Sequence, residues 1–104
     1  MDNELRELTD NDYEDFIQDG ACLVLLFKEK CPNCKVMKKV IAKCGSNLTD
    51  LKLASLNSET NPIMIEKLEI TRVPTLLLYH DGELKGRKSG IIKVPEVLNF
   101  CKKA

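Results

Sequence analysis

Tryptophan is absent from the sequence, and aromatic residues make up only 5% of its 104 positions. Net charge is absent too, because 16 lysines and arginines balance 16 aspartates and glutamates. A neutral chain has no overall electrostatic attraction to nucleic acid or to an anionic membrane surface. The longest apolar run, Ala21 to Phe27, is far shorter than the roughly 20 residues that cross a bilayer as a helix. We therefore expect neither nucleic acid nor a membrane as a partner.

The start of the sequence lacks the basic and apolar stretches of a secretory leader, and Arg6 is the only basic residue among the first 20. The five cysteines are an odd number, and only Cys31 and Cys34 have the spacing of a motif. This usage argues against a secreted domain stapled by disulfides and favours a reducing compartment. We expect a cytoplasmic protein.

Length and composition predict a single domain. A chain of 104 residues can build one hydrophobic core but not two. Its 43% hydrophobic and 31% charged residues are typical of an ordinary globular protein. We expect residues 1–104 to form one domain, and we expect a monomer.

The apolar pattern predicts an α/β fold in the order β-α-β-α-β-α-β-β-α. Cys22 to Phe27 is apolar on both alternating faces, as in a central strand covered by helices on both sides. Asp81-Gly82 between two strand patterns predicts an antiparallel hairpin, and Thr9 to Asp12 are predicted to cap the first helix. The remaining elements are an edge strand within 4–8, helices at 13–17, 32–44, 62–68 and 95–101, and strands at 51–56, 75–79 and 83–89.

The pair Cys31 and Cys34 is predicted at the junction between the central strand and the next helix, with Pro32 in the first helical turn. A Cys31 thiolate there would accept hydrogen bonds from unpaired backbone amides, which lowers its pKa. Cys34 follows one turn inward, where its sulfur would be shielded. One exposed thiol and one withheld thiol suit a two-step exchange, in which Cys31 attacks a disulfide and Cys34 resolves the mixed disulfide.

Two other interpretations of the cysteine pair remain open. The pair could be half of a tetrahedral zinc site, although Cys22, Cys44, Cys101 and His80 are scattered without the spacing of metal ligands. It could also be two inert structural thiols. We expect no metal. Cys22, Cys44 and Cys101 fall at apolar positions, with Cys101 expected to be the most exposed, and His80 is expected to be a surface residue.

Taken together, several segments resemble the thioredoxin family in order and spacing, over nearly the whole chain. Cys-x-x-Cys alone is weak evidence, but a Val-Pro-Thr sequence before a strand and a hairpin makes it specific. The segments are L-T-D-N-D-Y from Leu8, L-V-L-L-F-K-E-K-C-P-N-C-K from Leu23, L-N-S-E-T-N-P from Leu56 and R-V-P-T-L-L-L-Y-H-D-G from Arg72, followed by Gly90.

The resemblance implies a thioredoxin fold, with a central mixed sheet of four to five strands flanked by helices on both faces. It also implies a cis peptide before Pro74 beside the dithiol, which presents the backbone of Val73 to an extended substrate segment. The implied activity is reduction of disulfide-containing substrate proteins, with recycling by a thioredoxin reductase-like electron donor and no cofactor of the chain's own. Gly82 and Gly90 are expected to serve the backbone, in the turn and in a close approach near the substrate groove.

The chain departs from the family pattern in several places. Lys30 replaces the usual tryptophan, and Pro32-Asn33 lies between the cysteines. Leu25 occupies the position of a buried aspartate, and Ser55 that of the lysine that often pairs with it. Proton transfer at Cys34 would then use water or another group, for which Glu29 is a candidate. Arg72 and Lys30 would make the substrate rim basic, so we expect a preference for acidic partner surfaces.

Two alternative functions remain open. Cys-Pro-x-Cys suggests a glutaredoxin-like, glutathione-dependent oxidoreductase, but the chain lacks the Gly-Gly-Asp-like segment that such proteins use to hold glutathione. The other alternative is an adaptor that keeps the thioredoxin fold without turnover.

Overall fold

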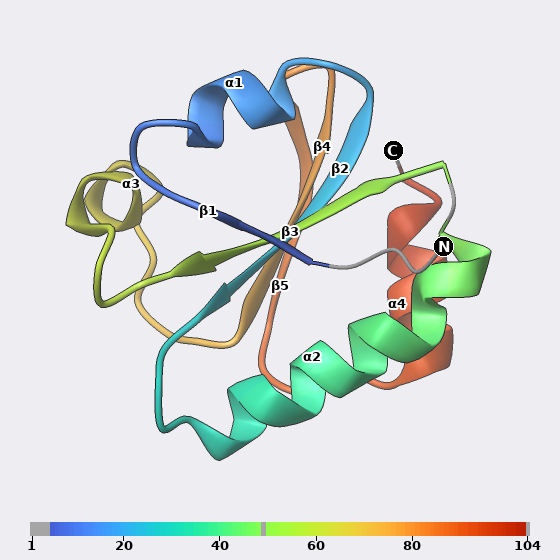
Figure 1. Cartoon of the computed structure of the whole chain (residues 1–104). Helices are drawn as coiled ribbons and strands as arrows, with labels where there is room; N and C mark the ends of the chain where they lie inside the picture. The colour runs from blue at the N-terminus through green and yellow to red at the C-terminus, as the bar shows by residue number, and fades with distance from the viewer. Residues whose placement is uncertain (1–4, 49, 104) are drawn as a thin grey trace.

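The computed structural model describes residues 5–48 and 50–103 and arranges them as a five-stranded sheet with helices on both faces (Figure 1). The predicted element order is confirmed, with a short 3-10 helix (Gly45–Asn47) added after the second helix. Asp2 and Glu4 of the acidic N-terminal segment lie outside the described residues. The elements are β1 (Arg6–Leu8), α1 (Tyr13–Ile17), β2 (Ala21–Phe27), α2 (Pro32–Cys44), β3 (Lys52–Asn57), α3 (Pro62–Lys67), β4 (Thr75–His80), β5 (Glu83–Ser89) and α4 (Val94–Cys101).

The sheet is mixed, with the strand order β1-β3-β2-β4-β5. Strands β1 and β2 both run parallel to β3, whereas β4 is antiparallel to β2 and β5 is antiparallel to β4. Asp81 and Gly82 join β4 to β5 with φ angles of 49° and 85°, the left-handed conformation that a two-residue hairpin turn requires. The predicted Asp-Gly hairpin and mixed sheet are therefore confirmed.

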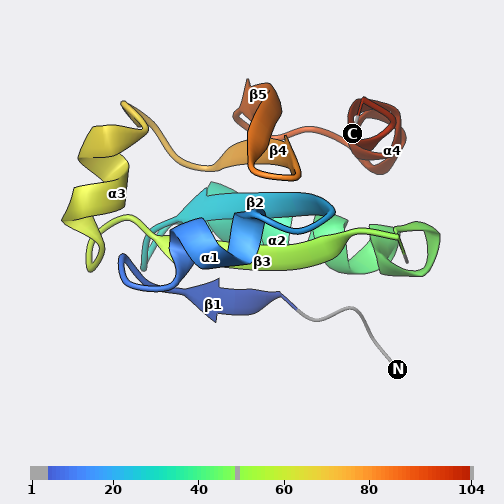
Figure 2. The same cartoon turned by 90° about the horizontal axis from the view of Figure 1, so that it is seen from above.

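Strand β2 is the central strand of the structure, and its two faces pack into two separate hydrophobic cores. Leu23, Leu25 and Phe27 pack on the side of α2 and α4. The alternate residues of the strand pack on the side of α1 and α3. Figure 2 shows α1 and α2 on opposite sides of the sheet. The continuous apolar run thus reflects a strand that is covered on both faces.

The polar cluster before α1 stabilises a different helix from the one predicted. Asp12 makes no side-chain cap on α1, and its carboxylate instead accepts a hydrogen bond from the backbone N–H of Thr9 at 2.6 Å. The carboxylate of Asp10 accepts the backbone N–H groups of Ile63 and Met64, at 3.3 and 2.8 Å, in the first turn of α3. The cluster therefore does cap a helix, but one that begins about 50 residues later, so the prediction for α1 was wrong.

The other end of α3 is held by the edge strand β5. The guanidinium of Arg87 donates hydrogen bonds to the carbonyl oxygens of Leu68 and Glu69, at 2.9 and 2.8 Å. Helix α3 is consequently tied at its start to the segment before α1 and at its end to β5. The loop that follows, residues 70–73, begins from this fixed point and leads into β4.

Gly86 on β5 is expected to tolerate no side chain, because the ring of Phe100 from α4 lies against it. A Cβ atom at Gly86 would lie 2.6 Å from Phe100 Cε1, and Phe100 is itself buried. We predict that Gly86→Ala lowers the free energy of unfolding by about 1–3 kcal/mol, the usual cost of overpacking. Urea denaturation measures this loss.

The matched control is Lys85→Ala, which truncates an exposed neighbour on the same strand and is expected to change stability by less than about 0.5 kcal/mol. Equal stability of the Gly86 variant and the wild type would contradict the close packing of Phe100.

Candidate active site

The sulfur of Cys31 caps helix α2. Cys31 has extended backbone angles (φ −108°, ψ 108°), Pro32 occupies the first helical turn, and the backbone N–H of Cys34 donates to Cys31 Sγ at 3.2 Å. The first amides of a helix have no partner within the helix, so an acceptor at this position is stabilised. A thiolate accepts such a bond more strongly than a neutral thiol does.

Both motif cysteines are enclosed, as predicted for Cys34 but not for Cys31. Cys31 was expected to be exposed, but its relative exposure is 7%, against 1% for Cys34. Both belong to the apolar core beneath α2, which also contains Leu25 and Phe27. The difference still has the predicted direction, because Cys31 is the more open of the two sulfurs.

The surroundings shift the pKa values of the two thiols in opposite directions. Hydrogen bonding from the Cys34 thiol lowers the pKa of Cys31 most, and the Cys34 amide and the charge of Lys28 act in the same direction against the effect of burial. Burial raises the pKa of Cys34 to about 11, with the neighbouring Cys31 adding to the increase. The surroundings thus favour the thiolate form of Cys31 and the protonated form of Cys34.

The core cluster that contains Cys34 also contains Leu25, the residue at the position of the family's buried aspartate. Leu25 is fully buried and lies between Ser55 of β3 and Leu76 of β4 in the sheet register. Glu29, the proposed proton relay, is exposed, and its backbone N–H is bound by the Glu59 carboxylate at 2.9 Å. The structure therefore gives no support to Glu29 as a base for Cys34.

The peptide between Val73 and Pro74 is cis, as the resemblance implied. Pro74 is buried, and its carbonyl accepts the backbone N–H of Gly90 at 2.9 Å. Gly90 has a φ of 87°, and a Cβ atom there would meet nothing within 4 Å. The left-handed backbone thus favours glycine here, whereas crowding by other protein atoms does not.

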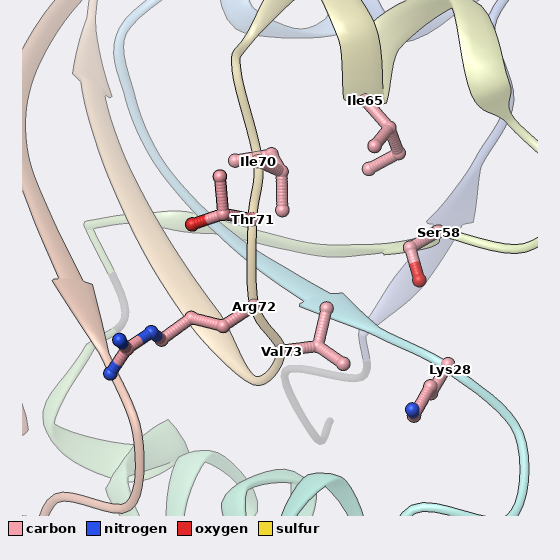
Figure 3. A pocket seen from close by; sticks show the side chains of 7 residues that line it. All are labelled: Lys28, Ser58, Ile65, Ile70, Thr71, Arg72 and Val73. Carbon is pink, nitrogen blue, oxygen red and sulfur yellow. The ribbon is translucent and has the colours of Figure 1, made fainter.

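A groove of about 440 Å³ lies beside the segment that carries the cis peptide (Figure 3). Of the residues expected to bind substrate, Val73 and Arg72 line it. Lys30 does not; it is exposed, with a φ of 56°. The full lining comprises Lys28, Ser58, Ile65, Ile70, Thr71, Arg72 and Val73.

The sequence had not assigned most of these residues to a substrate site, because they come from four separate segments. Lys28 follows β2, Ser58 follows β3, Ile65 belongs to α3, and Ile70 lies in the loop before β4. No motif spacing connects them. The available signal was topological, since β2 and β3 are parallel neighbours and the residues that follow them emerge at the same edge of the sheet.

The remaining cysteines are buried, as expected for small apolar side chains, and all five cysteines are free thiols. Cys101 is the most exposed of the three, as expected, although its relative exposure is only 8% and burial raises its pKa to about 11. His80 is exposed at the far end of β4 from Pro74, with Nε2 3.2 Å from the Asp81 carboxylate.

The described residues contain neither a metal-binding cluster nor a membrane-spanning helix. Within 5–48 and 50–103, no three histidine, cysteine, aspartate or glutamate side chains gather as a metal-binding group. In the same ranges, no helix has the length and apolar content needed to span a membrane.

Comparison with known proteins gives one consistent result. The family model described as thioredoxin matches residues 4–103. A thioredoxin of Buchnera aphidicola subsp. Schizaphis graminum is 29% identical over 101 residues, covering 94% of each chain. A thioredoxin of Chlamydia pneumoniae is 26% identical over 84 residues, covering 81% of this chain and 82% of the relative. A thioredoxin of Staphylococcus saprophyticus is 30% identical over 78 residues, covering 74% of this chain and 75% of the relative.

The hydrogen bonding between the two cysteines predicts how substitution of Cys34 changes Cys31. Cys34→Ala removes the thiol that lowers the pKa of Cys31 most, so this pKa should rise, whereas Cys34→Ser keeps a donor and should raise it less. The measurement is the rate of iodoacetamide alkylation at Cys31 against pH, read by peptide mass spectrometry.

In the wild type this rate should rise with a midpoint below that of a free cysteine, because only the thiolate reacts. At neutral pH the Ala variant should be alkylated most slowly. Identical pH profiles for the three proteins would show that Cys34 does not stabilise the Cys31 thiolate.

Proposed function

The chain belongs to the thioredoxin family, and we propose that it reduces protein disulfides by dithiol exchange through Cys31 and Cys34. The similarity to thioredoxins supports thiol-disulfide oxidoreductase chemistry at the level of the family. The observation that carries the specific proposal is the 3.2 Å bond from the Cys34 amide to Cys31 Sγ, with the Cys34 thiol enclosed directly behind.

In the first step the Cys31 thiolate attacks one sulfur of a substrate disulfide. A bond forms between Cys31 Sγ and that sulfur, the substrate S–S bond breaks, and the second substrate sulfur leaves as a thiolate that takes a proton from solvent. The Cys34 thiol, the Cys34 amide and the charge of Lys28 lower the pKa of Cys31 and so favour the thiolate that makes this attack. Residues near Val73 and Arg72 would align the substrate segment.

In the second step Cys34 attacks Cys31 Sγ, and the substrate's remaining sulfur leaves as a thiolate. The proton of Cys34 must go to water or to a departing thiolate, since the site offers Leu25 where a carboxylate would serve. Formation of the mixed disulfide itself assists, because the Cys31 thiolate is one of the groups that raise the pKa of Cys34. Hydrogen bonding with the Lys28 backbone lowers this pKa and remains in place.

The two steps leave a Cys31–Cys34 disulfide and a substrate that has gained two electrons and two protons. Another cycle requires the same two electrons and two protons from a donor, for which a thioredoxin reductase-like protein is proposed. The chemistry uses only sulfur, so the chain needs no cofactor of its own.

A glutaredoxin-like use of glutathione is the second candidate, favoured by Pro32 directly after Cys31. Turnover sustained by glutathione and glutathione reductase alone would support it over the thioredoxin type. An adaptor without turnover would bind partners equally well when Cys34 is replaced.

The proposal predicts that Cys34→Ser traps substrates. Without the resolving thiol, mixed disulfides at Cys31 should accumulate when the variant meets a protein disulfide such as that of insulin, while wild-type protein completes the reaction. Non-reducing electrophoresis with mass spectrometry of the Cys31 peptide detects the adduct.

The matched control is Cys31→Ser, which should trap nothing and lose insulin reduction. If Cys34→Ser formed no adduct at Cys31 while the wild type reduced insulin, the assignment of the two thiols would be abandoned.

A further inference from the structure

The groove beside the dithiol adjoins both segments that build the active site. Val73 on one wall directly precedes cis Pro74, and Lys28 on the other lies three residues before Cys31. Figure 3 shows Ile70 and Val73 facing Lys28, Ser58 and Ile65 across the groove. A substrate segment that presents a disulfide to Cys31 along Val73 would place a neighbouring side chain here. This inference rests on the proposed function.

The groove is positively charged. Its lining contains two cations, Lys28 and Arg72, and no acidic residue. Among residues 5–48 and 50–103, no carboxylate forms an ion pair with either cation, although Arg6, Lys67 and Lys85 each have one. Glu59, next to Ser58 in the chain, has its carboxylate bound to the Glu29 amide. The charge of the groove is therefore available to a ligand.

The two cations occupy different positions. Lys28 shares a wall with Ser58, whereas the guanidinium of Arg72 points away from Lys28 on the far side of the Val73 segment (Figure 3). A single carboxylate within the groove would thus meet the Lys28 ammonium and the Ser58 hydroxyl, with Arg72 adding charge at the rim. Ile65, Ile70 and Val73 supply apolar surface beside them.

We propose that this groove selects disulfide substrates that carry an acidic side chain next to an apolar one near the reacting cysteine, with Lys28 as the specificity-determining residue. Its volume of about 440 Å³ is within the usual range for ligand pockets, and a mix of apolar walls with few polar groups is typical of such sites. The sequence pointed to Lys30 and Arg72 for this preference, and the structure assigns the central position to Lys28.

The test compares reduction rates of peptide disulfides that differ only in Glu or Gln at each position near the cysteine. The ratio of kcat/KM for the Glu peptide to the Gln peptide should be about two- to fivefold for the wild type at low salt, the size of a partly exposed ion pair. Lys28→Gln should bring this ratio to one, and Lys28→Glu should invert it. Raising the salt to about 0.5 M should reduce the wild-type ratio.

The ratio is the deciding quantity because Lys28 also supports the Cys31 thiolate, so its loss slows every substrate. Lys39→Gln is the matched control: it removes the same charge from an exposed position on α2 outside the groove, and the wild-type ratio should persist. A ratio near one at every peptide position in the wild type, or an equal loss of selectivity in the Lys39 variant, would overturn the proposal.

A binding experiment distinguishes failure of the proposed reductase activity from failure of the groove proposal. Peptides with the cysteines reduced cannot react, but a Glu peptide should still shift the amide NMR signals of Ser58 and Val73, and should do so less in Lys28→Gln. If the protein reduced no disulfide yet showed this Lys28-dependent shift, the groove inference would hold and the reductase would not. If the protein reduced disulfides with no preference for Glu peptides and no shift of the Ser58 and Val73 signals, the reductase activity would hold and the groove inference would not.

Discussion

One hydrogen bond, from the amide of Cys34 to the sulfur of Cys31, organises the site. It satisfies an amide that the helix geometry leaves without a partner, and it stabilises charge on the sulfur that receives it. Helix α2 follows the central strand after residues 28–31 and is anchored in the core by Met37, Ile41 and Cys44, which holds its first turn in place. The proposed reactivity of the first thiol therefore depends on the packed helix and not on the tetrapeptide alone.

The environment of Cys34 has the opposite effect and disfavours the thiolate. Cys34 is enclosed with Leu25, and desolvation is the largest cause of its raised pKa. Because a buried carboxylate next to a thiol would also disfavour the thiolate, leucine at this position removes a repulsion together with a base. In the proposed mechanism the state of Cys31 controls when Cys34 can react, since forming the mixed disulfide eliminates a negative charge beside it.

Local patterns in the sequence were sufficient to predict the secondary-structure elements and the position of the cysteine pair. Apolar periodicity located the strands and helices, Asp81-Gly82 located the hairpin, and the spacing of Cys31 and Cys34 located the candidate dithiol. Long-range pairing was not accessible: Asp10 has the right neighbours to cap α1, and only the fold shows that its carboxylate reaches Ile63 and Met64.

The groove and the enclosure of the Cys31 sulfur were not predicted, because they too depend on long-range packing. Lys28 and Ser58 meet only where parallel strands end side by side, and the cis peptide before Pro74 was expected solely from the family resemblance. Cys101 sits near a chain end, yet packing of α4 against α2 buries it.

The hydrogen bonds at the two ends of α3 have a consequence for recognition. Asp10 fixes its start, Arg87 fixes its end, and the chain then passes through Ile70 and Val73 to a strand that is bonded on both sides. One wall of the groove is thereby part of the scaffold before any ligand arrives. Little conformational entropy remains to be lost there on association, so side-chain replacements in the wall can change partner choice while the fold stays the same.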